Sequence, residues 1–278
     1  DGVYVDVTFG GGGHSREIMS RLGEKGKLFA FDQDLDALKN AIDDERFTLI
    51  NENFRFIKRF LRFHGIKQVD GILADLGVSS HQFDVAERGF STRFDAELDM
   101  RMNQKGDISA YHVVNEYDEQ DIARVLFDYG ELKNARAMAN VIVTARKDKE
   151  IRNSDELKKV LAKFLPGHKS NKILAQIYQA IRIEVNQEMD VLKEFLEQSL
   201  EILKPGGRLS VISYHSLEDR LVKRFVKNGM FEGEPERDFF GNFEVPYKNI
   251  EKLIVPSEEE IAINNRARSA KLRVAEKI

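Results

Sequence analysis

The chain has 278 residues, of which 42% are hydrophobic and 32% charged, and its formal net charge is −4. This composition is typical of a globular protein and excludes a disordered chain, and no apolar run approaches the roughly 18 residues of a transmembrane helix. The absence of cysteine excludes disulfides and thiolate chemistry. With no secretory signal visible, we expect a cytoplasmic protein without a membrane partner, built as one large domain or two smaller ones.

Strand-like and helix-like segments alternate through the first part of the chain. Strands are expected at 3–7, 28–31, 47–50 and 71–76, and helices at 16–22, 35–42 and 57–63. This alternation with short connections predicts an α/β fold with a mostly parallel sheet, covered by helices on both faces. The chain begins without Met directly on the first strand, so we expect that a further N-terminal segment precedes it.

The pattern changes to helical periodicity between residues 106 and 182, and Lys and Arg outnumber Asp and Glu between 133 and 172. A long helical stretch within an α/β chain predicts an inserted helical subdomain. Its basic excess makes this insert a candidate docking surface for nucleic acid. We therefore expect a sheet domain in two parts, 1–105 and 183–278, separated by a substrate-recognition subdomain at 106–182.

The sheet is expected to resume after the insert. A long amphipathic helix ends at a Lys-Pro-Gly-Gly stop, 204–207, and the apolar alternation of 208–213 predicts a fifth strand. Residues 272–275 predict a last edge strand. A helix closed by Pro-Gly-Gly before an apolar strand resembles a junction of Rossmann-like methyltransferases, which favours S-adenosylmethionine over NAD.

Four glycines at 10–13 follow the first predicted strand, and Asp32 ends the second. Glycine has no Cβ, so this backbone can approach a ligand closely, and the amides at the start of the next helix face that ligand. Asp32 is placed to accept hydrogen bonds from two ribose hydroxyls. The pattern predicts a nucleoside cofactor, with a tight turn in a structural domain as the alternative, since the G-x-G-x-x-G spacing is absent.

Loops that follow parallel strands meet at one edge of a sheet, so the residues after each predicted strand are candidate site residues. They include 75–82 after the fourth strand and 213–220 after the fifth. Asp75 lies between two apolar residues at a strand end, which favours a functional carboxylate over a core residue.

Six blocks of sequence, in a fixed order, span nearly the whole chain. They are DVTFGGGGHS (6–15), DGILADLGVSS (70–80), ERGFS (87–91), LDMRM (98–102), ISYHSLEDR (212–220) and NNRARSAKLR (264–273). Together they resemble the bacterial 16S rRNA cytosine-N4 methyltransferase family (RsmH/MraW type). The resemblance implies a Rossmann-like class I methyltransferase that uses S-adenosylmethionine to methylate the N4 amine of a cytidine in the decoding region of small-subunit (16S) rRNA.

The resemblance also implies roles for individual residues. It carries over seven cofactor-binding residues, which are Gly12, Gly13, His14, Asp32, Phe54, Asp75 and Gln82. Eight residues are candidates for RNA binding, namely Arg88, Phe90, Arg101, Arg220, Arg266, Arg268, Lys271 and Arg273. Phe90 is a candidate for stacking on the flipped target base, with packing of its own loop as the alternative. No metal is expected.

The catalytic residue is left open by the sequence. Amino-methyltransferases often carry an Asp/Asn-Pro-Pro-aromatic motif after the fourth strand, where this chain has Asp75-Leu76-Gly77-Val78. Asp75 is the first candidate to accept the N4 proton, unless it is only a cofactor ligand. His215 is the second candidate, with a structural role as its alternative.

Two other functions compete with methylation. An NAD-dependent dehydrogenase shares the glycine loop and the acidic residue but leaves the loops after strands four and five unexplained. A non-catalytic RNA-binding or assembly module with a Rossmann-like core is the alternative from another class. The expected partner is 16S rRNA or the small ribosomal subunit, and a homodimer is left open.

Overall fold

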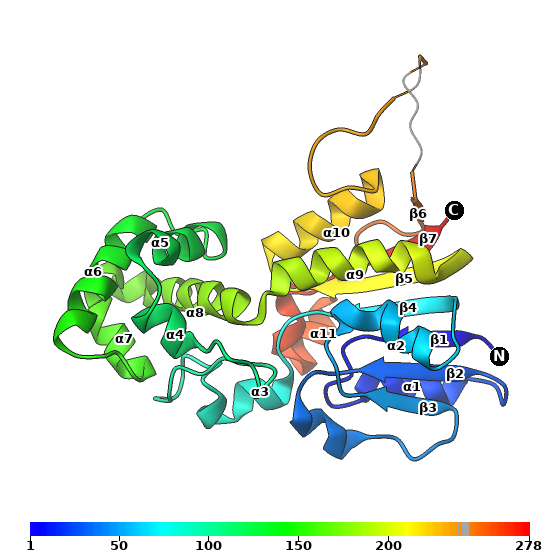
Figure 1. Ribbon diagram of the computed structural model, residues 1–278, viewed down its shortest axis with the longest axis horizontal. Helices are drawn as coiled ribbons and strands as arrows, with labels where there is room; N and C mark the ends of the chain where they lie inside the picture. Colours follow the sequence, from blue (N-terminus) through cyan, green and yellow to red (C-terminus); the bar gives the residue numbers. More distant parts are fainter. Residues whose placement is uncertain (238, 241–244) are drawn as a thin grey trace. The chain divides into compact units, whose positions relative to one another are not determined.

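The computed structural model describes residues 1–237, 239–240 and 245–278. Its contacts divide the chain into two compact units, unit 1 (Asp1–Gly77 and Met189–Ile278) and unit 2 (Val78–Glu188). Unit 1 contains the sheet and unit 2 is helical (Figure 1). Unit 2 is longer than the expected insert of 106–182 because residues from the preceding segment, including Phe90 and Leu98, pack into its core.

Unit 1 is built on a seven-stranded sheet. In spatial order its strands are β3 (Phe47–Ile50), β2 (Lys27–Phe31), β1 (Val3–Asp6), β4 (Val69–Asp75), β5 (Leu203–Ser213), β7 (Lys271–Lys277) and β6 (Tyr247–Asn249). Strands β1 to β5 pair in parallel, and β7 runs antiparallel to both of its neighbours. This arrangement confirms the mostly parallel, Rossmann-like sheet.

Helices cover both faces of this sheet (Figure 1). On one face lie α2 (Ile57–Phe63), α9 (Glu188–Ile202) and α10 (Ser216–Asn228), and on the other lies α1 (Gly13–Arg21). Side chains of β2 alternate between the two apolar cores, because Phe29 and Phe31 pack with α9, whereas Leu28 and Ala30 pack with α1. Both faces of the sheet are therefore buried, as parallel strands require.

Two local expectations need correction. The segment expected as a helix at 35–42 is a 3₁₀ helix, η1 (Leu35–Asn40), which the Asp34 carboxylate caps by accepting from the Asp36 amide at 3.1 Å. The Lys-Pro-Gly-Gly stop is part of β5, since α9 already ends at Ile202. Leu203 and Arg208 both pair with β4, and a register shift between these pairs accommodates the residues between them.

Unit 2 contains the helices expected from the periodicity of 106–182. They are α4 (Ala110–Asn115), α5 (Glu119–Asp128), α6 (Ala135–Asp148), α7 (Ser154–Val160) and α8 (Ser170–Asn186), and α3 (Ser80–Asp84) precedes them. Their apolar stripes meet in one core, in which Val125, Ile142 and Ile177 are fully buried. Among the described residues, no helix is long and apolar enough to cross a membrane.

We expect Phe195→Ala to lower the free energy of unfolding by about 3–5 kcal/mol, because it leaves a cavity in the core of unit 1. Phe195 has no solvent-exposed surface and packs edge-on against Phe54. Urea denaturation checks this value. Phe63→Ala is the matched control, since Phe63 is 83% exposed and its loss should change stability by less than about 0.5 kcal/mol. Equal effects of the two substitutions would contradict this packing.

Candidate functional site

The glycine loop joins β1 to α1 at the carboxyl edge of the sheet. Gly10 and Gly12 have φ angles of 51° and 77°, a left-handed conformation that favours glycine. A Cβ on Gly12 would lie 2.9 Å from the ring of Phe9, whereas one on Gly11 or Gly13 would meet no atom within 4 Å. Gly12 is therefore required by the backbone itself, and open space for a ligand lies beside Gly11 and Gly13.

The first turn of α1 has free donors for such a ligand. Its N-cap residue is Gly12, which has no side chain to accept a hydrogen bond from the first amides of the helix. Unpaired amides at a helix N-terminus attract negatively charged or electron-rich groups. The loop and the helix start together form a cradle of backbone donors.

Asp6, the last residue of β1, is fully buried and fixes this loop to the sheet. Its carboxylate accepts hydrogen bonds from the Ser15 hydroxyl at 2.7 Å and the Thr8 amide at 3.1 Å. Burial raises the pKa of Asp6 against the opposing effect of these two donors. Asp6 is not among the expected site residues, although it shares with Asp75 the signal of a carboxylate at the end of an apolar strand.

Asp32 closes the glycine loop from the end of β2. Its carboxylate accepts from the Gly10 amide at 2.7 Å and from the Asp34 amide at 2.8 Å. Burial raises the pKa of Asp32 to about 6, although both amides favour the ionised form. A carboxylate has more acceptor sites than these two amides occupy, so Asp32 can still accept from a ligand.

Asp75 connects the loops that follow β1, β4 and β5. Its Oδ1 accepts from the Tyr214 hydroxyl at 2.9 Å, and its Oδ2 lies 3.3 Å from Nε2 of His14. The backbone amide of Asp75 donates to the Thr8 hydroxyl at 2.6 Å, which links this residue to the loop that Asp6 fixes. The hydrogen bond to Asp75 raises the pKa of His14.

Tyr214 is not among the expected site residues, yet its hydroxyl is a direct partner of Asp75. Burial raises the pKa of its hydroxyl, and the charge of Asp75 raises it further. The hydroxyl therefore stays protonated and donates to the carboxylate. Its role depends on the register of β4 and β5, which the local sequence does not reveal.

Three other expected residues have identifiable packing or capping contacts. Phe54 is partly buried, with its ring edge-on to Phe195 at 5.4 Å. Gln82 belongs to unit 2, where it forms a capping box with Ser79 at the start of α3. His215 caps α10, and its Nε2 lies 3.1 Å from the Glu218 carboxylate. These contacts favour the structural alternative for His215 and leave Asp75 as the candidate proton acceptor.

Two RNA-binding candidates lie in the interior of unit 2. Arg88 is only 7% exposed, and its Nη2 donates to the carbonyls of Arg101 and Met102. Phe90 is 5% exposed and belongs to the apolar core of the same unit. The position of Phe90 favours the packing role that the sequence leaves open.

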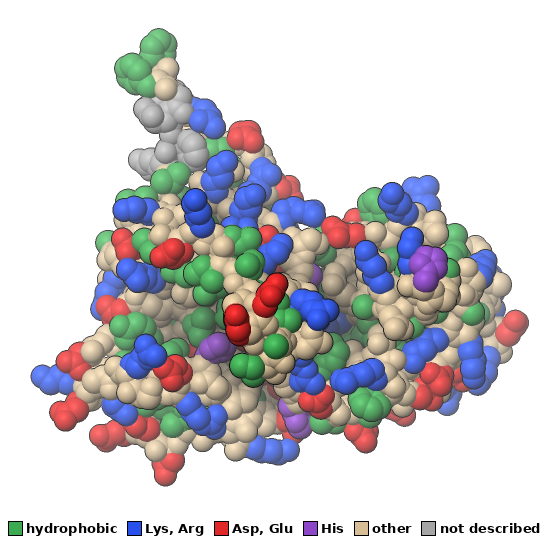
Figure 2. Space-filling model, turned by 180° about the vertical axis from the view of Figure 1, so that it is seen from behind, with side chains coloured by type: hydrophobic (Ala, Val, Ile, Leu, Met, Phe, Trp, Pro, Cys, Tyr) green, Lys and Arg blue, Asp and Glu red, His purple; other side chains and the backbone are tan. Residues whose placement is uncertain are grey.

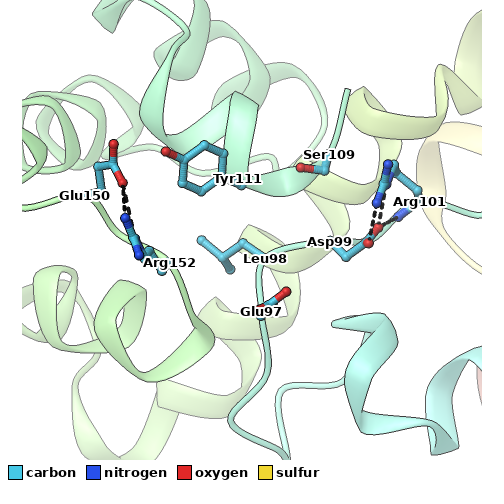
Figure 3. Close-up of a pocket in the computed structure, with 8 residues that line it drawn as sticks. All are labelled: Glu97, Leu98, Asp99, Arg101, Ser109, Tyr111, Glu150 and Arg152. Carbon is cyan, nitrogen blue, oxygen red and sulfur yellow. Dashed lines mark hydrogen bonds and ion pairs between the residues drawn. The ribbon is translucent and has the colours of Figure 1, made fainter. Parts of the chain in front are cut away.

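A third candidate, Arg101, lines a pocket of about 360 Å³ within unit 2 (Figure 3). It donates to both carboxylate oxygens of Asp99, at 2.9 and 2.8 Å, and Arg152 pairs with Glu150 at 2.9 Å elsewhere in the lining. The full lining is Glu97, Leu98, Asp99, Arg101, Ser109, Tyr111, Glu150 and Arg152. Because acidic side chains outnumber and neutralise its two arginines, this pocket lacks the positive charge that a phosphate group requires.

The basic C-terminal candidates fall into two groups. Arg266 and Arg268 are exposed on η6 (Asn265–Ser269). Lys271 and Arg273 on β7 both contact Asp219 of α10, at 3.4 and 2.8 Å. Burial of Asp219 opposes its ionisation, but these two cations outweigh that effect and lower its pKa.

A family model described as the MraW methylase family matches residues 1–278. A protein of Flavobacterium johnsoniae named ribosomal RNA small subunit methyltransferase H is 81% identical over 278 residues, which cover the whole chain and 92% of that protein. The protein of the same name from Bacteroides thetaiotaomicron is 56% identical over 278 residues, again the whole chain, and 91% of its own length is covered.

Solved structures resemble the chain more distantly. An rRNA methylase from Streptococcus thermophilus aligns with a TM-score of 0.44 at 12% identity, covering the whole chain and 87% of that protein. Aeropyrum pernix fibrillarin in complex with S-adenosyl-L-methionine aligns with a TM-score of 0.37 at 10% identity, covering 99% of the chain and 66% of fibrillarin.

We expect Asp75→Asn to lower the pKa of the His14 imidazole, because it removes the carboxylate that raises it. A raised histidine pKa stabilises the fold fully below the unfolded value of about 6.5, and this contribution is lost as the pH rises through the folded pKa. The stability difference between wild type and Asp75→Asn should therefore be larger at pH 5.5 than at pH 8. NMR titration of His14 and thermal melts at both pH values measure these effects.

Asp44→Asn is the control for this titration. Asp44 pairs with Arg46 just before β3 and has no contact with His14. It should leave the His14 titration unchanged. An unchanged His14 pKa in Asp75→Asn would contradict the contact.

Proposed function

The chain belongs to the MraW methylase family, and from that premise we propose that it transfers a methyl group from S-adenosylmethionine to the N4 amine of a cytidine in the decoding region of 16S rRNA. The names of its relatives support an rRNA substrate in the small ribosomal subunit. The observation that carries the proposal is the position of Asp75, which contacts both the glycine loop and the end of β5. We place the reaction in the cytoplasm, with 16S rRNA or the small subunit as partner.

The carboxyl edge of unit 1 fits the proposed cofactor. When bound, S-adenosylmethionine supplies an electrophilic methyl group on its sulfonium. Asp32 would hold the ribose hydroxyls, Phe54 would lie beside the adenine, and the open side of Gly11 and Gly13 would face the methionine part. This assignment is supported by the acceptor capacity of Asp32 and by the open space that a Cβ on Gly11 or Gly13 would meet. For Gln82, which lies in unit 2, the proposal rests on the family resemblance alone.

Asp75 would act on the target base. The N4 lone pair of cytosine is conjugated into the ring, so an acceptor for an N4 hydrogen both favours attack and takes up the released proton. The Asp75 side chain is 27% exposed, and each of its oxygens keeps a lone pair beyond its contact with Tyr214 or His14. These two contacts fix the orientation of the carboxylate, which limits the loss of entropy on reaching the transition state.

The dehydrogenase and the non-catalytic RNA-binding module gain no support from the comparisons. The dehydrogenase would share the glycine loop and Asp32, but neither alternative uses the contacts of Asp75. The proposed methyl transfer uses the glycine loop, Asp32 and the contacts of Asp75.

We expect the affinity for S-adenosylhomocysteine to be constant above about pH 7 and to fall as the pH drops through about 6. The reason is that the ionised Asp32 accepts from ribose hydroxyls more strongly than the protonated form. Titration calorimetry between pH 5 and 8 measures this dependence. Asp32→Asn should bind more weakly at pH 7.5 and lose the step near pH 6, whereas Asp44→Asn should keep the wild-type profile. If the fall in affinity near pH 6 persists in Asp32→Asn, Asp32 does not belong to the cofactor site.

We expect small-subunit rRNA from cells that lack the protein to be missing one N4-methylated cytidine. Digestion and mass spectrometry of the purified rRNA test this. The wild-type protein and Asp44→Asn should restore the modified nucleoside, and Asp75→Asn should not, because it can no longer accept the N4 proton. Finding the same nucleoside in cells without the protein would rule out this activity.

A further inference from the structure

We propose that the exposed face of α10 binds the phosphate backbone of the RNA substrate beside the cofactor site. This inference rests on the proposed function and adds to it the surface that holds the strand. The surface, called here the α10 stripe, consists of Arg220, Lys223, Arg224 and Lys227.

The α10 stripe follows from the amphipathic pattern of the helix. Val222, Phe225 and Val226 are buried in the core of unit 1. The four cations recur at i, i+3, i+4 and i+7, the spacing that places residues on one side of a helix. Lys223 and Lys227 are exposed, whereas Arg224 is partly buried and donates to the carbonyl of Gly233.

The charge of this face is not balanced by the acidic residues of the same helix. Glu218 is buried and accepts from the amides of Tyr214 and His215. Asp219 is engaged by Lys271 and Arg273 of β7. No acidic residue follows within α10, so the helix from its second turn onward carries only positive charge.

Lys223 and Lys227 have no carboxylate partner within the described part of the chain. By contrast, Lys39, Lys149 and Lys158 each pair with a nearby carboxylate. An ammonium group that has not formed an internal ion pair can neutralise a phosphate without first breaking one. The α10 stripe therefore has two cations available for an external polyanion.

The α10 stripe also begins beside the proposed site of chemistry. Tyr214, which contacts Asp75, precedes the first residue of α10 by two positions. From Arg220 to Lys227 the helix rises by about 10 Å, close to three steps of about 3.4 Å along one strand of a nucleic acid duplex. A strand bound along this helix would have its phosphates in register with several cations while one of its nucleotides lies near Asp75.

The charged residues around α10 bear on how far its cationic surface extends. Figure 2, which views the molecule from behind, shows Lys and Arg side chains mixed with Asp and Glu side chains over that side of unit 1. The next charged residues after α10 are Glu232, Glu234 and Glu236. This change of sign limits the cationic surface to the helix itself.

The test uses the double variant Lys223→Gln/Lys227→Gln. Its affinity for an RNA transcript of the 16S decoding region is measured by fluorescence anisotropy between 50 and 200 mM salt. We expect weaker binding at low salt, and a log–log salt slope smaller in magnitude by about 1.4–1.8, since each neutralised phosphate contributes about 0.7–0.9. Lys223→Arg/Lys227→Arg keeps both charges and should keep the wild-type slope.

Lys25→Gln/Lys27→Gln is the matched control. These two exposed lysines lie just before β2 and at its first residue, on the far side of β1 and β4 from β5, and their loss changes the net charge equally. This control should bind RNA with the wild-type slope. All variants should bind S-adenosylhomocysteine as the wild type does, because none of the substituted residues belongs to the proposed cofactor site.

The outcomes separate this inference from the proposed function. If the wild type methylates small subunits and the α10 double variant keeps the wild-type salt slope, the α10 stripe is not an RNA-binding surface and the proposed function stands. Equal loss of slope in the Lys25/Lys27 control would also overturn the inference, since the effect would then be one of net charge. If the wild type methylates no cytidine, the proposed function fails whatever the slopes are.

Discussion

The burial of one carboxylate at the end of β1 constrains the whole candidate site. Asp6 has no exposed surface, and a buried ionisable group is tolerated only when donors surround it. Ser15 on α1 and the amide of Thr8 provide those donors, and the Thr8 hydroxyl accepts from the amide of Asp75. The path of the glycine loop, the start of α1 and the end of β4 are thus set by a single set of contacts.

The carboxylates of this site differ in their partners from the arginine-paired carboxylates of the chain. Asp6, Asp32 and Asp75 are held by backbone amides, hydroxyls and an imidazole. Carboxylates outside the site, such as Asp99 and Glu194, are paired with arginine guanidinium groups. Neutral donors fix the position of a carboxylate but leave its charge and some of its lone pairs available. A carboxylate paired with arginine therefore serves the structure, whereas one held by neutral donors keeps a capacity to bind a ligand.

Strands β1 to β5 and β7 were predictable because each is an apolar or alternating run, and the mostly parallel sheet followed from their alternation with helices. The expected edge position of 272–275 was wrong, because β7 lies between β5 and β6. Strand β6 was not, since its three residues, Tyr247–Asn249, have no such pattern and pair only with β7. The partnership of Tyr214 with Asp75 depends on the register between two strands far apart in sequence. The burial of Arg88 likewise depends on tertiary packing, because its local segment is polar and rich in turn residues.

Under the proposed function, Asp32 would couple occupancy of the site to the stability of unit 1. Its pKa lies well above that of a solvated aspartate, so at neutral pH its ionised form is held at a cost in free energy that the unfolded chain does not bear. A ligand that donates hydrogen bonds to this carboxylate lowers that cost, and it does so only in the folded protein. Binding and folding therefore reinforce each other at this residue, and the concentration of ligand in the cell becomes one of the determinants of how much folded protein the cell contains.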